Sequence, residues 1–174
     1  MNFLSLTLKK IETEIENARA GKPSGIFAKM NALIDSDMIQ ALYKASNAGV
    51  PIRLIVRGIC ALRPGVPGLS ENIEVRSIIG RFLEHSRIFR FENNRDPDFY
   101  IGSGDWMTRN LKERVEALVP IEDADLKAHL EEILRIYWAD NTKSHSMLPT
   151  GEFIHRQPEA KVPAFDAQRH FQMN

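Results

Sequence analysis

The stretch that decides the fold is "SGIFAKMNALIDSDMIQALYKASNAGVPIRLIVRG", residues 24–58. It opens with an apolar run that predicts a strand of five or six residues, and a helical pattern capped by Asp35 or Ser36 follows. The run "PIRLIVRG" at residues 51–58 predicts a second strand. A strand, a helix and a strand within about 30 residues form a βαβ unit, in which the strands are parallel and the crossover is right-handed. The sequence therefore predicts an α/β domain.

Further elements extend this unit on both sides. Apolar residues at helical spacing predict an amphipathic helix over residues 2–20. Downstream, the patterns predict strands at 73–79, 85–91, 99–104, 114–121 and 151–157, a helical turn at 105–110 that Asp105 caps, and a helix at 123–140. We expect one domain over residues 1–157, a mixed sheet flanked by helices, and a poorly ordered tail over residues 158–174.

The composition is that of a soluble globular protein. Hydrophobic residues make up 43% and charged residues 26% of the chain. No apolar run approaches the roughly 20 residues that would span a bilayer, and the first residues do not resemble a signal peptide. Cys60 is the single cysteine, which excludes an internal disulfide and a thiolate metal cluster and is consistent with a reducing cytosol.

The net charge of zero hides a basic middle segment. Every cation between residues 53 and 95 is an arginine, and only four glutamates accompany them. The arginines are Arg53, Arg57, Arg63, Arg76, Arg81, Arg87, Arg90 and Arg95. Because the planar guanidinium matches two oxygens of a phosphate or carboxylate at once, this bias favours an oxyanion ligand. The alternative is a set of surface salt bridges to the same glutamates.

Polar side chains follow the ends of the two strands of the βαβ unit. Ligands of open α/β sheets gather beyond the carboxyl ends of the strands. Lys29 and Asn31 stand at that end of the first strand, and Arg57 stands at that end of the second. We therefore expect these three residues to converge on one edge of the sheet.

A second group of candidates lies in the predicted strand 85–91 and after it. Strand alternation puts His85 and Arg87 on one face, so that a proton-transfer group lies beside a fixed charge. The string "GSGDWMTRN" at 102–110 predicts a Gly-Ser turn at Ser103, whose free backbone N–H groups would bind an anion. Together these features describe half of a site that handles phosphoryl groups.

These strings carry a resemblance. A histidine, a cation two residues later and a downstream Gly-Ser turn resemble the half-motif of the phospholipase D superfamily. More narrowly, the chain resembles the C-terminal catalytic domain of bacterial polyphosphate kinase from about Ile11 to about Arg156. The strings that carry this resemblance are "KMNAL" at 29–33, "IVRGICALRPGVPGLSENI" at 55–73, "VRSIIGRFLEHSRIF" at 75–89 and "YIGSGDWMTRN" at 100–110.

The resemblance implies a phospholipase D-like fold and reversible transfer of the terminal phosphate of ATP to polyphosphate. It assigns His85 as the second essential histidine of the family, and Arg57 and Arg114 as contacts of the nucleotide phosphates. Lys29, Asn31, Arg87 and Ser103 join these as expected phosphate-binding residues. Mg²⁺ would accompany ATP, and we assign it no ligands because the sequence offers no carboxylate cluster.

The chain departs from the family pattern in two respects. We expect it to lack the N-terminal and head domains and the first phospholipase D-like domain, which carries the phosphorylated histidine, and hence to be inactive alone. Arg87 also stands where the superfamily motif has lysine, which fits phosphate binding and disfavours phosphodiesterase chemistry. The expected partners are ATP, ADP, polyphosphate and the missing part of the enzyme, in the cytoplasm or at the inner face of the membrane, with a homo-oligomer allowed and no nucleic acid.

Two alternatives remain open at this point. The chain could be a polyanion-binding module without catalysis. It could also be a phospholipase D-type phosphodiesterase that works as a dimer of halves.

Overall fold

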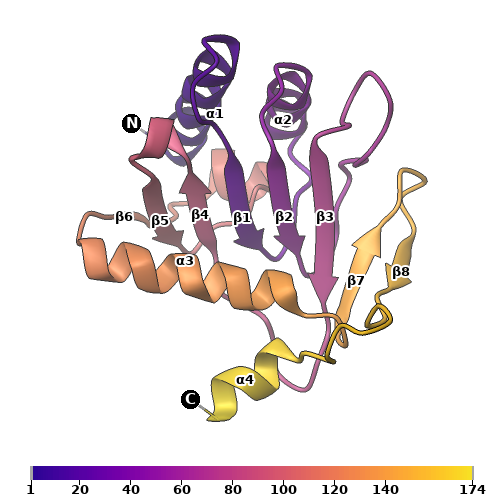
Figure 1. The fold of residues 1–174 in the computed structure, drawn as a ribbon. Coiled ribbons are helices and arrows are strands. Elements are labelled where there is room, and N and C mark those ends of the chain that lie inside the picture. Colours follow the sequence, from indigo (N-terminus) through magenta and orange to yellow (C-terminus); the bar gives the residue numbers. More distant parts are fainter. Residues whose placement is uncertain (1, 174) are drawn as a thin grey trace.

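The computed structural model describes residues 2–173 as an eight-stranded sheet with helices on both faces (Figure 1). The helices are α1 (Phe3–Arg19), α2 (Ser36–Asn47), α3 (Ala124–Ala139) and α4 (Ala167–Met173), with the short helical segments η1 (Asn93–Arg95) and η2 (Arg109–Glu113). The strands are β1 (Ile26–Met30), β2 (Ile52–Val56), β3 (Ile73–Ile78), β4 (Ile88–Phe91), β5 (Asp98–Gly102), β6 (Leu118–Ile121), β7 (Ser144–Met147) and β8 (Phe153–His155). The predicted α/β fold with a mixed sheet is confirmed.

The sheet has parallel strands at its centre and antiparallel strands on both sides. Its order is β6-β5-β4-β1-β2-β3-β7-β8. β1, β2 and β3 are parallel, and β1 pairs with β2 from Ile26↔Ile52 to Met30↔Val56. β4, β5 and β6 on one side and β7 and β8 on the other are antiparallel to their neighbours. The βαβ unit predicted from residues 24–58 is confirmed.

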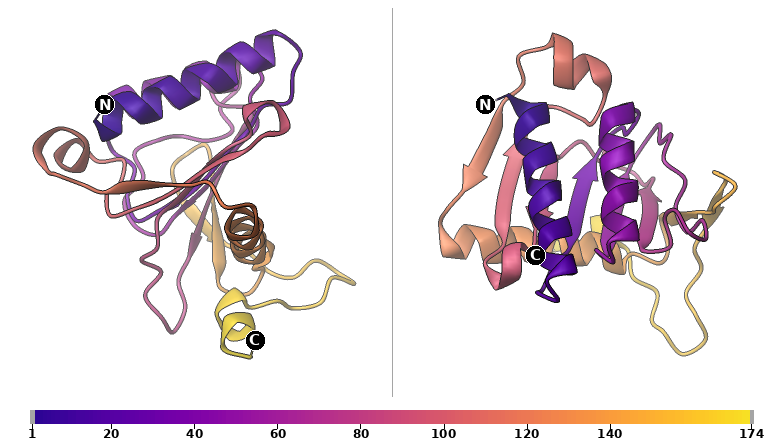
Figure 2. Two further views of the ribbon diagram at one scale, coloured as in Figure 1. Left: turned by 90° about the vertical axis from the view of Figure 1, so that its left-hand side faces the viewer. Right: turned by 90° about the horizontal axis from the view of Figure 1, so that it is seen from above.

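The two faces of the sheet are covered by different helices. α1 and α2 lie side by side on one face, and α3 crosses the other face (Figure 2). Because neighbouring residues of a strand point to opposite faces, Ala28 packs in the core under α1 and α2, whereas Phe27 packs with Leu134 of α3. All five residues of β1 are buried, as expected for a central strand covered on both sides.

The start of β4 differs from the prediction. Strand pairing begins at Ile88, so His85 and Arg87 precede the strand instead of lying within it. At this end of β1, side-chain hydrogen bonds take the place of backbone pairing with β4. The Asp105 carboxylate accepts the N–H of Asn31, and the Lys29 ammonium donates to the hydroxyl and the carbonyl of Ser86. The predicted strand 85–91 was therefore three residues too long at its start.

Three other segments also differ from expectation. The sequence patterns did not predict β7, whose polar residues pair with β3. Asp105 does not cap a helix, because its carboxylate binds Asn31 and Arg87 instead. Within the predicted tail 158–174, residues 167–173 form α4, which buries Ala167 and Gln168. The domain boundary at residue 157 stays a prediction.

Among residues 2–173, none of the helices combines the length and the apolar character that a bilayer crossing requires.

The thiol of Cys60 should react slowly in the folded domain. Burial raises its pKa to about 11, and Leu62 O accepts the weak S–H hydrogen bond at 3.8 Å. Since the thiolate is the nucleophile, the folded protein at pH 8 should hold about 100-fold less reactive thiolate than an unfolded chain. Alkylation followed by mass spectrometry, with and without urea, measures the two rates. Equal rates would show that the thiol is open to solvent.

Candidate active site

A pocket of about 490 Å³ lies at the edge of the sheet where β4 begins and β5 ends. Because these strands are antiparallel, the segment before β4 and the segment after β5 meet at the same edge. Arg109 and Asn110 of η2 and the stretch between η2 and β6 close the pocket. The lining residues are His85, Arg87, Ser103, Asp105, Met107, Arg109, Asn110, Arg114 and Glu116. Four of the predicted site residues, His85, Arg87, Ser103 and Arg114, thus line one pocket.

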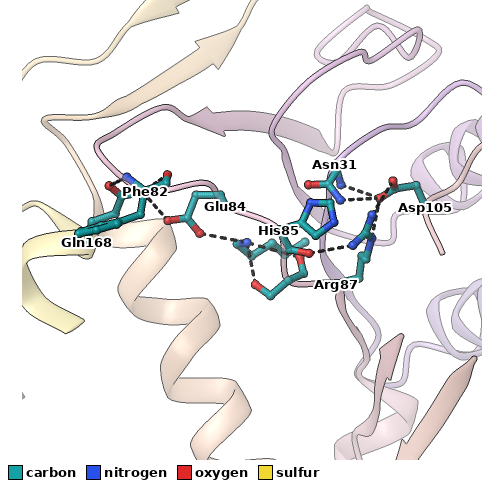
Figure 3. Close-up of polar contacts among 9 residues, drawn as sticks. Asn31, Phe82, Glu84, His85, Arg87, Asp105 and Gln168 are labelled. Carbon is teal, nitrogen blue, oxygen red and sulfur yellow. Dashed lines mark hydrogen bonds and ion pairs between the residues drawn. The ribbon is translucent and has the colours of Figure 1, made fainter. Parts of the chain in front are cut away.

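An ion pair with Asp105 orients Arg87 in this pocket. Arg87 Nε lies 3.2 Å from Asp105 Oδ1, and Nη2 lies 3.1 Å from Oδ2, while Nη1 donates to His85 O at 2.9 Å (Figure 3). Both side chains are largely buried, at 12% and 8% exposed. The guanidinium has five N–H donors, so these three bonds leave two for a ligand. The arrangement pre-orients a cation beside the exposed imidazole of His85.

Lys29 and Asn31 lie beneath the pocket and do not line it. The Lys29 side chain is 1% exposed, and its ammonium is bound by Glu84 at 3.2 Å and by the Ser86 hydroxyl at 2.8 Å. Asn31 is 6% exposed and donates its backbone N–H to Asp105 at 2.7 Å. Both residues therefore support the site from below, and the structure does not expose them to a phosphate as the sequence analysis expected.

The burial of Lys29 changes its proton affinity. Desolvation lowers the pKa of the ammonium, the nearby Glu84 carboxylate opposes this shift, and the positive charges of Arg57 and Arg87 add to it. The ammonium also lies 4.6 Å from the centre of the Tyr137 ring. Burial, followed by a hydrogen bond to Glu84, raises the pKa of the Tyr137 hydroxyl. Lys29, Glu84 and Tyr137 thus form a polar cluster that links β1, the segment before β4 and α3.

Two backbone N–H groups of the Gly-Ser turn are hydrogen-bonded within the protein. The N–H of Ser103 donates to Ala117 O at 3.0 Å, and the N–H of Gly102 donates to Arg87 O at 3.3 Å. A Cβ at Gly102 would lie 2.8 Å from Ala117 O, and a Cβ at Gly104 would lie 2.7 Å from the Phe3 ring. Glycine is therefore required at both positions for close approach of the chain. The N–H groups of Gly102 and Ser103 are not free for an anion, and the anion-binding turn otherwise stays a prediction.

Glu116 is a pocket residue that the sequence analysis did not identify. Its carboxylate accepts from Ser103 Oγ and from Asn110 Nδ2, each at 2.5 Å. The hydrogen bond from Ser103 is the largest cause that lowers the pKa of Glu116, and Arg114 and Arg87 contribute through their charge. Within the strand pattern predicted for 114–121, nothing marked this carboxylate, because its partners are distant in sequence or lie in the preceding turn.

Arg57 lines a neighbouring pocket of about 460 Å³ and not the one that holds His85 and Arg114. Glu84 and Arg81 line the same neighbouring pocket. The Arg57 Nε is buried and has no hydrogen-bond partner among the residues that the structure describes. Since Glu84 and His85 are consecutive, the two pockets adjoin along one segment. Of the three residues to which the resemblance assigns roles in catalysis and nucleotide binding, His85 and Arg114 therefore line one pocket and Arg57 lines the neighbouring one.

The residues present do not form a metal site on their own. Across residues 2–173, no group of three or more His, Cys, Asp or Glu side chains is placed to hold a metal ion. In the pocket, Asp105 is engaged by Arg87, and Glu116 is engaged by Ser103 and Asn110. We therefore assign no Mg²⁺ ligands to this chain.

Comparison with known proteins identifies the family. The model of the family described as "Polyphosphate kinase C-terminal domain 2" matches residues 2–168. The polyphosphate kinase of Thermosynechococcus vestitus is 59% identical over 152 residues, covering 87% of this chain and 21% of that protein. The polyphosphate kinase of Synechocystis sp. is 50% identical over 171 residues, covering 98% of this chain and 24% of that protein. The chain thus spans about a fifth to a quarter of these relatives.

Solved structures agree with this assignment. The crystal structure of polyphosphate kinase from Porphyromonas gingivalis matches with a TM-score of 0.94 and 38% identity, over 99% of this chain and 27% of that chain. The phospholipase D family member Nuc from Salmonella typhimurium matches with a TM-score of 0.54 over 79% of this chain and 90% of that chain. At 15% identity the second likeness concerns the fold alone. The chain has the phospholipase D-like fold and belongs to the polyphosphate kinase family, as its C-terminal domain 2.

Proposed function

We propose that this domain forms one wall of an ATP:polyphosphate phosphotransferase site, with His85, Arg87, Ser103 and Arg114 as its phosphate-binding groups. The observation that carries the proposal is the single pocket that these four residues line. An imidazole and two guanidinium groups offer donors to the oxygens of a phosphate, whereas the Ser103 hydroxyl would first have to give up its hydrogen bond to Glu116. The family to which the chain belongs supplies the substrate class.

The proposed reaction proceeds in two transfers. A histidine on another domain of the enzyme attacks the γ-phosphorus of ATP, so that an N–P bond forms as the P–O bond to ADP breaks. The terminal oxygen of polyphosphate then attacks the phosphohistidine, a P–O bond forms, and the N–P bond breaks. Both steps are reversible, and the donor ATP places the reaction in the cytoplasm.

The residues of this chain stabilise these transfers by charge and hydrogen bonding. Arg114 and the two free donors of Arg87 offset negative charge on the equatorial oxygens of the transferred group. His85 donates a proton or a hydrogen bond to the bridging or entering oxygen. Mg²⁺, which the family implies as the companion of ATP, would offset charge on the nucleotide phosphates, and we assign it no ligand among the described residues.

Removal of Arg114 tests the proposal by direct binding. A charge-assisted hydrogen bond contributes about 1.5–3 kcal/mol, so Arg114→Ala should weaken binding of long-chain polyphosphate at least about tenfold. Arg135→Ala is the matched control, because Arg135 is an exposed arginine on α3 that does not line the pocket. Isothermal titration calorimetry measures both constants. Equal weakening by both variants would show that binding follows net charge and not this pocket.

The activity of the chain by itself distinguishes the proposal from its alternatives. Because the phosphorylated histidine belongs to another domain, the purified 174-residue chain should make no polyphosphate from ATP. Synthesis by this chain alone would contradict a mechanism that needs a histidine from another domain. Binding without turnover that no added domain converts into catalysis would favour the polyanion-binding module, and hydrolysis of a phosphodiester substrate would favour the phosphodiesterase.

A further inference from the structure

The segment that carries His85 lies outside the strands of the sheet. Residues 82–87 lie outside every helix and strand of the described chain, between β3 and β4. His85 and Ser86 are exposed, whereas Glu84 is only 6% exposed. A segment without strand pairing needs other contacts to hold one conformation, because each ordered residue costs about 1–2 kcal/mol of backbone entropy.

Gln168 of α4 supplies these contacts at the start of the segment. Its Oε1 accepts from Phe82 N at 3.0 Å, and its Nε2 donates to Phe82 O at 2.8 Å and to Glu84 Oε1 at 2.6 Å (Figure 3). The amide thus pairs with Phe82 as a neighbouring strand would, and both of its N–H groups are used. Gln168 itself is 6% exposed. A Cβ atom at Gly80 would overlap the same amide, so the chain closes tightly around it.

The contacts continue along every second residue of the segment. The second carboxylate oxygen of Glu84 lies 3.2 Å from the Lys29 ammonium, which also donates to the Ser86 hydroxyl at 2.8 Å. Phe82, Glu84 and Ser86 are therefore all held from the interior. His85 lies between Glu84 and Ser86, whose side chains both contact Lys29, and it lines the pocket.

The rest of the fold holds Gln168 in place. The Asp140 carboxylate, which is buried at the end of α3, accepts from the N–H of Ala167 at 2.8 Å. The rings of Tyr137 on α3 and Phe171 on α4 lie 5.1 Å apart. α4 is thus anchored on both sides of Gln168, and the amide has little freedom to leave Phe82.

We propose that Gln168 is a positioning residue for the phosphate site: through Phe82 and Glu84 it sets the position of the His85 imidazole. The last helix of the chain is therefore part of the support of the site. This inference rests on the proposed function in one respect, namely that His85 contacts the bound phosphate. Its structural half, the ordering of residues 82–87, is independent of that.

Replacing Gln168 with methionine removes the hydrogen bonds and keeps the length of the side chain. In Gln168→Met, hydrogen–deuterium exchange of the Phe82 amide, which donates to Gln168 Oε1, should become at least tenfold faster, while exchange in β1 and β2 stays unchanged. Gln172→Met is the matched control on the same helix, because Gln172 is exposed and lacks a side-chain hydrogen bond within the described chain. Gly80→Ala, which displaces the same amide from the other side, should reproduce the effect if Gln168→Met does not fold.

Polyphosphate affinity in a double-mutant cycle separates positioning from general stability. Gln168→Met should weaken binding of long-chain polyphosphate about three- to tenfold in the otherwise unaltered chain. In a His85→Ala background it should cause no further loss, since the group that it positions is gone. Additive losses, or unchanged exchange of the Phe82 amide, would overturn the inference. If Arg114→Ala binds polyphosphate as the parent chain does, the proposed function fails, and the exchange experiment still decides the role of Gln168.

Discussion

Replacing Lys29 with methionine should destabilise the domain by about 3–5 kcal/mol, because the change leaves the buried Glu84 carboxylate without its counter-charge. Lys29 is 1% and Glu84 6% exposed, and their charged groups lie 3.2 Å apart. The carboxylate would keep the Gln168 amide as a partner but would lose its only cation within the described chain. Urea unfolding monitored by circular dichroism gives the free energy of unfolding by linear extrapolation.

Two further variants test the cause of this loss. The double variant Lys29→Met/Glu84→Gln should regain most of the stability, because removal of both charges leaves no buried ion unpaired. Lys10→Met removes the more exposed pair between Lys10 and Asp98, at 24% and 26% exposure, and should cost less than about 1 kcal/mol. If Lys29→Met cost no more than Lys10→Met, the burial of the Lys29–Glu84 pair would not be the source of its importance.

Removal of the Arg87 side chain should affect stability and ligand binding together. Arg87→Ala leaves the Asp105 carboxylate, at 8% exposure, without its ion pair, which predicts a loss of about 3–5 kcal/mol. It also removes a guanidinium from the pocket, so polyphosphate affinity should fall at least about tenfold. Urea unfolding and calorimetric titration of the same protein measure the two effects.

A second substitution separates these two effects. Arg87→Ala/Asp105→Asn removes the unpaired carboxylate and should recover stability without recovering polyphosphate affinity. Arg87→Lys keeps the charge but replaces the two-pronged contact with Asp105 by a single ammonium, so it should bind polyphosphate more weakly than the parent chain. Full affinity in Arg87→Lys would show that charge alone matters at this position.

The arginine-rich segment illustrates how far composition alone could be interpreted. The bias towards arginine predicted an oxyanion site, and Arg87 does line the pocket. Other members of the set have structural partners. Arg76 packs 3.7 Å from the centre of the Trp138 ring, and Arg90 pairs with Glu92 and Glu131. The two interpretations of the segment, ligand binding and salt bridges, therefore both apply, to different residues.

The sequence by itself determined the elements and the family. Hydrophobic period and cap residues are local properties, so they located α1, α2, α3 and the parallel β1–β2 pair, and long matching strings identified the polyphosphate kinase domain. Local patterns also placed His85 and Arg87 close together. These patterns reflect the conformational preferences of short backbone segments, and the same segments adopt those conformations in the folded chain.

Only the tertiary structure decided which polar side chains face the pocket and which support it. Lys29 and Asn31 appeared equivalent to Arg57 at the ends of their strands, yet both are buried beneath the site. Their positions depend on Glu84 and Asp105, which lie more than 50 residues away in sequence. The contact of Gln168 with Phe82 spans 86 residues. A buried charge is tolerated only where the folded chain brings an oppositely charged or hydrogen-bonding partner next to it. Such a partner can lie far away in sequence, so local sequence patterns do not predict it.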